Sequence, residues 1–187
     1  MTFGWTIRST MSADRRAVLA LVKEAFSGDG RDGHEEVEIV ERTWEVGDPT
    51  RRLDLVAVED NGQLVGHVLA APGDLRSKEA GRDTGAPASR SVLAVAPLAV
   101  LPSRQRQGVG SSLMREVLSR AQSSGAPMVV LLGHPTYYPR FGFEPGDAYG
   151  IAYDPVGFGN PAFMVRPFVP LGDGWCGSFT YCWEDPQ

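Results

Sequence analysis

The chain has 187 residues, of which 42 % are hydrophobic and 22 % charged, a size and composition that suit one globular domain with a sizeable core. Its net charge is −5, its pI is about 5.2 and its basic residues are scattered, so nucleic acid is not an expected partner. No stretch approaches the roughly 18 apolar residues of a membrane-spanning helix and the first residues lack the apolar core of a signal peptide, so we predict a cytoplasmic protein with no membrane partner.

The first part of the chain predicts a strand, two helices and a hairpin. Residues 5–9 (WTIRS) are typical of a short strand, and residues 12–26 have apolar side chains at helical spacing behind Ser12 as a candidate N-cap. A second helix is predicted over residues 34–46. Two alternating apolar segments then flank Asn61-Gly62, the dipeptide that most strongly indicates a β-hairpin.

The middle of the chain predicts a loop followed by a strand–helix–strand unit. Residues 72–91 are rich in Gly, Pro, Ser and charge without periodicity, which favours a long mobile loop inside the domain. Residues 91–100 predict a strand, residues 108–124 a helix that ends at Gly125, and residues 127–133 a second strand. This order is typical of a parallel crossover, so the fold class is mixed α/β.

The last part of the chain, residues 146–187, is rich in Gly, Pro and aromatic residues. It predicts further short strands at AFMVRPF and GSFTYCW. Cys176 and Cys182 have a spacing that fits no familiar metal or redox motif, so buried, reduced thiols are expected. With no internal repeat visible, we predict one domain over residues 1–187.

The glycine turn at the start of the third predicted helix, residues 108–124, predicts an anion site. Gly108 and Gly110 stand where the first helical N–H groups lack partners, and the helix dipole adds partial positive charge there. The helix is anchored by a buried stripe formed by Val109, Leu113, Val117 and Ala121. On these two glycines alone, an ordinary turn that permits tight packing is an equal alternative. A P-loop is excluded because no lysine follows Gly110, and Leu113 stands where a Rossmann turn needs a third glycine.

Two blocks of sequence extend this pattern. The first is Gln105-Arg106-Gln107-Gly108-Val109-Gly110, which follows Leu98-Ala99-Val100, and the second is YPRFGF, from Tyr138 to Phe143. Together they resemble the signature blocks of the GNAT superfamily, the acyl-CoA-dependent N-acyltransferases. The resemblance in element order covers residues 5 to about 145, and residues 146–187 look like the tail of a branch of small, uncharacterised bacterial members.

The resemblance implies a GNAT fold, with a central mixed, largely antiparallel sheet flanked by helices and a parallel, splayed strand pair around the acyl-CoA site. It implies acetyl-CoA as cosubstrate, without a metal. The implied contacts with acetyl-CoA come from Leu98, Ala99, Val100, Gln105, Arg106, Gln107, Gly108, Val109, Gly110 and Ser111, and a backbone N–H near Val100 would support the oxyanion. Pro97 marks either the splay or a solvent-facing strand edge.

The implied reaction moves an acetyl group from acetyl-CoA to a primary amine, with Tyr138 as general acid. A phenol suits protonation of a thiolate. Tyr137 is adjacent, and core packing is the alternative role for either ring. The alternative function is a non-catalytic acyl-CoA-binding or regulatory module. The acceptor is open among a peptide N-terminus, lysine, a polyamine, an aminoglycoside and an amino-acid metabolite, and the protein is expected as a monomer or homodimer.

The general base is not assigned by these motifs. Four acids lie on the second predicted helix, where a solvated face is the favoured interpretation: Glu35, Glu36, Glu38 and Glu41. His34 lies near them but has no second histidine at ligand spacing, so a metal site is not predicted. His67 is expected to be structural. His134 stands where the resembling branch commonly carries Asp, so a contact with coenzyme A and a proton relay both stay open.

Overall fold

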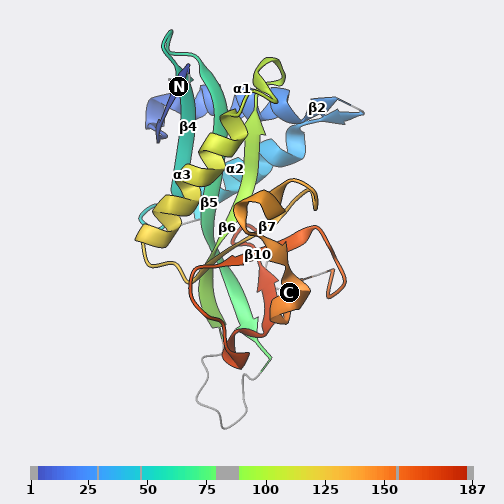
Figure 1. Cartoon of the computed structure of the whole chain (residues 1–187). Helices are drawn as coiled ribbons and strands as arrows, with labels where there is room; N and C mark the ends of the chain where they lie inside the picture. Colours follow the sequence, from blue (N-terminus) through green and yellow to red (C-terminus); the bar gives the residue numbers. More distant parts are fainter. Residues whose placement is uncertain (1–3, 29, 47, 79–88, 155, 185–187) are drawn as a thin grey trace. The chain divides into compact units, whose positions relative to one another are not determined.

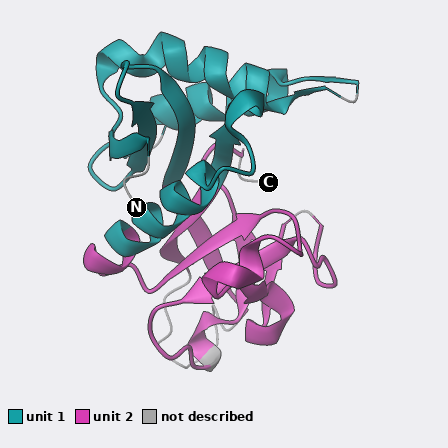
Figure 2. Cartoon of the chain, turned by 45° about the horizontal axis from the view of Figure 1, so that its top comes forward, with its two compact units in different colours: residues 1–70, 96–120 teal, residues 71–95, 121–187 magenta. Residues whose placement is uncertain are grey.

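The structure is a computed structural model that describes residues 4–28, 30–46, 48–78, 89–154 and 156–184 (Figure 1). The chain divides into two compact units (Figure 2). Unit 1 comprises residues 1–70 and 96–120, and unit 2 comprises residues 71–95 and 121–187. Within the described residues, no helix is long and apolar enough to span a bilayer.

Unit 1 contains three helices and the strands on which they pack. Its elements are β1 (Trp5–Ser9), the 3₁₀ turn η1 (Ser12–Asp14), α1 (Arg15–Phe26), the short strands β2 (Ser27–Gly28) and β3 (Arg31–Asp32), α2 (His34–Val46), β4 (Leu53–Glu59), the first half of β5 (Leu64–Ser77), the end of β6 (Ser89–Val100), the 3₁₀ turn η2 (Pro102–Arg104) and most of α3 (Val109–Ser123). β4 pairs antiparallel with both β1 and β5, and Gly62, with φ +86°, allows the turn between β4 and β5.

The helices of unit 1 pack on both faces of its strands. Gly66 in β5 lies under α3, since a Cβ built there would lie 2.8 Å from side-chain atoms of both Val109 and Leu113. Successive residues of a strand point to opposite faces, so His67 points away from α3. The His67 imidazole instead bonds Asp54, which also accepts the indole N–H of Trp44 in α2. α2 and α3 therefore cover opposite faces.

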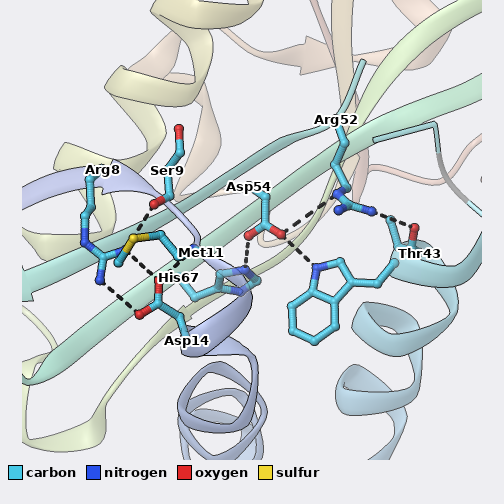
Figure 3. Close-up of polar contacts among 9 residues, drawn as sticks. Arg8, Ser9, Met11, Asp14, Thr43, Arg52, Asp54 and His67 are labelled. Atoms are coloured by element: carbon cyan, nitrogen blue, oxygen red, sulfur yellow. Dashed lines mark hydrogen bonds and ion pairs between the residues drawn. The ribbon is translucent and has the colours of Figure 1, made fainter. Parts of the chain in front are cut away.

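A buried polar network joins α2 to β4 and β5 (Figure 3). The Asp54 carboxylate accepts hydrogen bonds from Nε2 of His67 at 2.9 Å and Nε1 of Trp44 at 2.7 Å, and Nε of Arg52 lies 3.9 Å away. Burial alone would raise the pKa of Asp54, but the bond and charge of His67 and the Trp44 bond hold that pKa below its usual value. The Asp54 side chain is only 14 % exposed and His67 is fully buried, so the network fixes α2 on the sheet.

Replacing Asp54 by Ala should destabilise the fold by roughly 2–5 kcal/mol, because it leaves the fully buried imidazole of His67 and the indole N–H of Trp44 without their acceptor. Since folding lowers the pKa of Asp54, the stability from its ionised form is present above pH ~4 and is lost as the pH falls through the lowered folded-state pKa. Chemical denaturation at pH 7 and at acid pH measures both effects. Asp60→Ala, at an exposed position, should change stability by less than about 0.5 kcal/mol, and an equally small loss for Asp54→Ala would contradict the prediction.

Unit 2 contains strands, 3₁₀ turns and the end of α3. Besides parts of β5, β6 and α3, its elements are β7 (Met128–Leu132), η3 (Tyr138–Phe141), β8 (Glu144–Pro145), η4 (Gly146–Tyr149), β9 (Ile151–Tyr153), β10 (Phe163–Pro167), η5 (Asp173–Trp175) and β11 (Gly177–Thr180). β10 lies between β7 and β8 and pairs antiparallel with both. β11 pairs antiparallel with the end of β5 and parallel with β9.

The sheet is mixed and largely antiparallel, as predicted. Its main strand order is β1-β4-β5-β6-β7-β10-β8. The predicted parallel pair is formed by β6 and β7, whose register runs from Leu93↔Val129 to Val95↔Leu131. That register ends two residues before Pro97, the residue for which a splay and a solvent-facing strand edge are the two predicted roles. The predicted buried stripe of α3 is also confirmed: Val109, Leu113, Val117 and Ala121 are each at most 1 % exposed.

Three local predictions are corrected. Ser12 is not the N-cap of α1, because residues 12–14 form a separate 3₁₀ turn and α1 begins at Arg15. The proposed loop over residues 72–91 is wrong at both ends, since β5 runs to Ser77 and β6 starts at Ser89; residues 79–88 lie outside the described part of the chain. Cys176 and Cys182 form no disulfide within the described residues, as expected, but are half-buried and not buried.

Candidate functional site

The glycine turn of unit 1 links the end of β6 to α3. It passes through η2 and then through two left-handed residues, Arg106 with φ +60° and Gly108 with φ +100°. A glycine is favoured at Gly108 because side chains rarely adopt this conformation. Leu98 and Val100 are half-buried while Ala99 between them is buried, which is the alternation of a strand with one covered face.

Side chains of the turn fix it to its own backbone and to β4. The amide of Gln105 donates to the Val100 carbonyl at 3.3 Å, and the amide of Gln107 donates to the Ser103 carbonyl at 2.9 Å. Arg104 forms an ion pair with Glu59 at the end of β4, and its hydrogen bond lowers the pKa of that carboxyl. The turn thus has a defined shape before any ligand binds.

The N-terminus of α3 presents backbone donors. The Ser112 N–H bonds the Gly108 carbonyl at 2.9 Å, so the N–H groups of Val109, Gly110 and Ser111 precede this first helical bond. No acidic residue lies in the first turn of α3, so nothing in that turn cancels the partial positive charge of the helix dipole. Gly66 lets Val109 and Leu113 approach β5 closely, which holds this helix end in place. The arrangement is suited to bind a phosphate group.

Tyr138 lies in unit 2, at the first position of η3. Its ring stands directly on Gly133, because a Cβ built on that glycine would come within 2.1 Å of Cε2 of Tyr138. It also makes edge-to-face contacts with Tyr137 at 5.0 Å and Phe143 at 5.9 Å between ring centroids. Burial, and to a lesser degree Tyr137, raises the pKa of Tyr138 to about 12, so its phenol is protonated at neutral pH.

Tyr137 has different surroundings. The guanidinium of Arg140 lies 4.7 Å from its ring centroid, and Phe141 packs edge-on at 5.4 Å. His134, on the same segment, is exposed, and its carbonyl accepts the Tyr137 N–H at 2.9 Å. The contacts of Tyr137 are those of a packing residue, and the two roles considered for the His134 imidazole stay predictions.

The acidic face of α2 is solvated, as favoured from the sequence. Glu35, Glu38 and Glu41 are exposed, Glu36 is half-buried, and Glu38 lies 3.3 Å from the imidazole of His34. The expected structural role of His67 fits its bond to Asp54. Among the described residues, no group of three or more His, Cys, Asp or Glu side chains is placed to hold a metal ion.

The structure keeps the predicted ligand-binding residues, from Leu98 to Ser111, together in unit 1 and places Tyr138 in unit 2. Sequence reasoning missed Gly66 and Gly133, the glycines on which α3 and Tyr138 pack. Each is a glycine inside or directly after an apolar strand, a position that often marks close approach of another segment.

Comparisons with known proteins agree with this geometry. Residues 6–146 match the family model described as an acetyltransferase (GNAT) domain. The uncharacterized N-acetyltransferase YhbS of Escherichia coli K12 is 33 % identical over 138 residues, which are 74 % of this chain and 72 % of that protein. The crystal structure of E. coli YhbS in complex with CoA is similar with TM-score 0.74 and 29 % identity, covering 97 % of this chain and 91 % of that one. A GNAT family acetyltransferase from Brucella melitensis in complex with acetyl-CoA is similar with TM-score 0.72 and 28 % identity, covering 95 % of both chains.

Proposed function

The chain belongs to the GNAT acetyltransferase family, and from that premise we propose that it transfers the acetyl group of acetyl-CoA to a primary amine. The observation that carries the proposal is the glycine turn, whose left-handed Gly108 is followed by the backbone donors of Val109, Gly110 and Ser111. The similar Brucella melitensis structure holds acetyl-CoA and the similar YhbS structure holds CoA, which supports acetyl-CoA as the ligand of this turn.

Acetyl-CoA would place its phosphates on this turn. The N–H groups at the start of α3 would donate to phosphate oxygens, and Arg106 would add positive charge from the turn itself. The backbone of Leu98, Ala99 and Val100, at the end of β6, would pair with the pantetheine arm as an added strand would.

The reaction that follows is direct transfer. The neutral amine attacks the thioester carbonyl carbon, its oxygen takes up negative charge, and a backbone N–H near Val100 supports that charge. The C–S bond then breaks, and the thiolate of CoA accepts a proton from the Tyr138 phenol. The acetylated amine loses its extra proton to solvent or to a base that the sequence does not assign, and the Tyr138 phenolate takes up a proton from solvent, which restores the acid. With its pKa raised to about 12, the Tyr138 phenol carries its proton throughout the neutral range, so the proton is present when the thiolate departs.

A thiol-release assay tests the proposal. Purified protein with acetyl-CoA is mixed separately with an amino-acid ester, a lysine peptide, a polyamine, an aminoglycoside and a peptide with a free N-terminus. We expect at least one amine to raise CoA release above the rate without acceptor, with acetylated amine found by mass spectrometry. If acetyl-CoA binds but no amine raises the rate, the non-catalytic acyl-CoA-binding module becomes the better description.

A further inference from the structure

Tyr181 lies directly after β11, in the segment beyond the matched family domain. Its side chain is almost fully buried, with 4 % of the residue exposed. The Tyr181 hydroxyl accepts a hydrogen bond from the backbone N–H of Leu132, the last residue of β7, at 3.0 Å. A residue 49 positions later in the chain therefore completes the hydrogen bonding of β7.

The Leu132 N–H has this partner because of where the parallel strand pair ends. The next N–H, that of Gly133, bonds the Ala162 carbonyl beside β10, and successive N–H groups of a strand point to opposite sides. The Leu132 N–H therefore points to the side on which β6 pairs with β7. The register with β6 ends at Val95↔Leu131, one residue before Leu132. The Tyr181 hydroxyl therefore accepts the hydrogen bond of the next backbone N–H, that of Leu132.

The segment held in this way carries Tyr138. Gly133, which follows Leu132 directly, is the glycine on which the Tyr138 ring stands, with no room for a Cβ between them. Burial raises the pKa of Tyr181 and outweighs the hydrogen bond from Leu132, which lowers it. The nearby Tyr138 adds a smaller contribution that raises it, so both hydroxyls stay protonated at neutral pH. A shift of the β7 end would move the surface under the Tyr138 ring.

We propose that Tyr181 is a positioning residue for Tyr138: its hydroxyl fixes the end of β7 at Leu132 and so fixes Gly133, on which the Tyr138 ring rests. This inference rests on the proposed function, in which Tyr138 protonates the departing thiolate. It gives the segment after β11 a part in the reaction, since orientation of a proton donor to within a fraction of an ångström affects the rate strongly.

The test removes the Tyr181 hydroxyl and keeps its ring. In Tyr181→Phe the ring still stacks on Trp183 at 4.2 Å and meets Phe179 edge-on at 4.9 Å, so the fold is retained. We expect kcat to fall about tenfold, with the KM for acetyl-CoA changed by less than about twofold. Tyr153→Phe is the matched control, because Tyr153 belongs to the same aromatic cluster but its hydroxyl bonds Glu184; we expect an unchanged kcat.

A double variant separates positioning from a purely structural role. If Tyr181 acts through Tyr138, adding Tyr181→Phe to Tyr138→Phe lowers kcat no further. Amide exchange of Leu132 provides a readout without activity, and it should become faster in Tyr181→Phe but not in Tyr153→Phe. The inference is overturned if Tyr181→Phe keeps full kcat while Tyr138→Phe loses it, or if the two losses multiply in the double variant. Full kcat in Tyr138→Phe alone would instead overturn the proposed role of Tyr138.

Discussion

Gly110→Glu should abolish the binding of acetyl-CoA and leave the protein folded. At about a hundredfold excess over its dissociation constant, acetyl-CoA should stabilise the wild-type fold by roughly 2.7 kcal/mol. Gly110 lies in the first turn of α3, beside the backbone donors that would hold the phosphates, so a glutamate there brings both bulk and a like charge. The free variant should not be destabilised through the helix dipole, because an acidic side chain near a helix N-terminus is favourable. The measurement is the shift in unfolding temperature on adding acetyl-CoA.

Gly172→Glu is the matched control for this experiment. It adds the same charge at an exposed glycine with no heavy atom within 4 Å of a built Cβ, so it should keep the full ligand-induced shift. A folded Gly110→Glu protein with an undiminished shift would show that the glycine turn is not the acetyl-CoA site. Loss of the shift in both variants would point to net charge and not to the turn.

The elements that could be predicted from the sequence are those whose signals are local. Asn61-Gly62 indicates the β4–β5 hairpin by itself, because the left-handed conformation of Gly62 is what such a turn needs. The helical spacing of Val109, Leu113 and Val117 predicts α3 and its buried face in the same way. The glycine turn is equally local, because all its residues are consecutive.

The elements that were missed depend on partners far along the chain. Residues 72–77 have the composition of a loop, yet they extend β5 because β11 pairs with them, from Gly177↔Ser77 to Thr180↔Asp74. Gly73 looks like a turn residue, but a Cβ there would lie 2.6 Å from the ring of Phe179, so this glycine permits the approach of β11. A strand that forms only by pairing with a distant segment leaves little signal in its own residues.

The N-terminus of α1 was misplaced for a different reason, because side-chain contacts between residues near in the chain decide where the helix begins. Ser12 is a favourable capping residue, but the Asp14 carboxylate accepts the Met11 N–H at 2.7 Å and forms a two-bond ion pair with Arg8 of β1 (Figure 3). These contacts, with the hydrogen bond from Arg8 first, lower the pKa of Asp14. They stabilise a 3₁₀ turn at residues 12–14, and α1 starts after it.

Tyr138→Phe should lower kcat by about 10² to 10⁴ while leaving the affinity for acetyl-CoA nearly unchanged, because only the proton for the departing thiolate is lost. The phenylalanine ring can still stand on Gly133 and meet Phe143, so the segment should keep its shape. Because the pKa of Tyr138 is raised to about 12, its ionisation does not lower the wild-type rate below pH ~10, and the ratio of wild-type to variant kcat should be constant between about pH 7 and 9. Steady-state kinetics over that range, with several amines, measures the ratio.

Tyr137→Phe is the internal control, since it removes a hydroxyl one residue away from a ring that packs on Arg140 and Phe141, and its effect should be within about threefold. A large loss of kcat in Tyr137→Phe with near-normal kcat in Tyr138→Phe would mean that Tyr137 donates the proton to the thiolate. Near-normal rates in both would leave the thiolate to be protonated by solvent. A ratio of wild-type to variant kcat that falls steeply with rising pH would mean that the Tyr138 phenol ionises within the working range, whereas its burial opposes ionisation. If this ring gives its proton to the thiolate, the loss of kcat in Tyr138→Phe at pH 7 must therefore persist at pH 9.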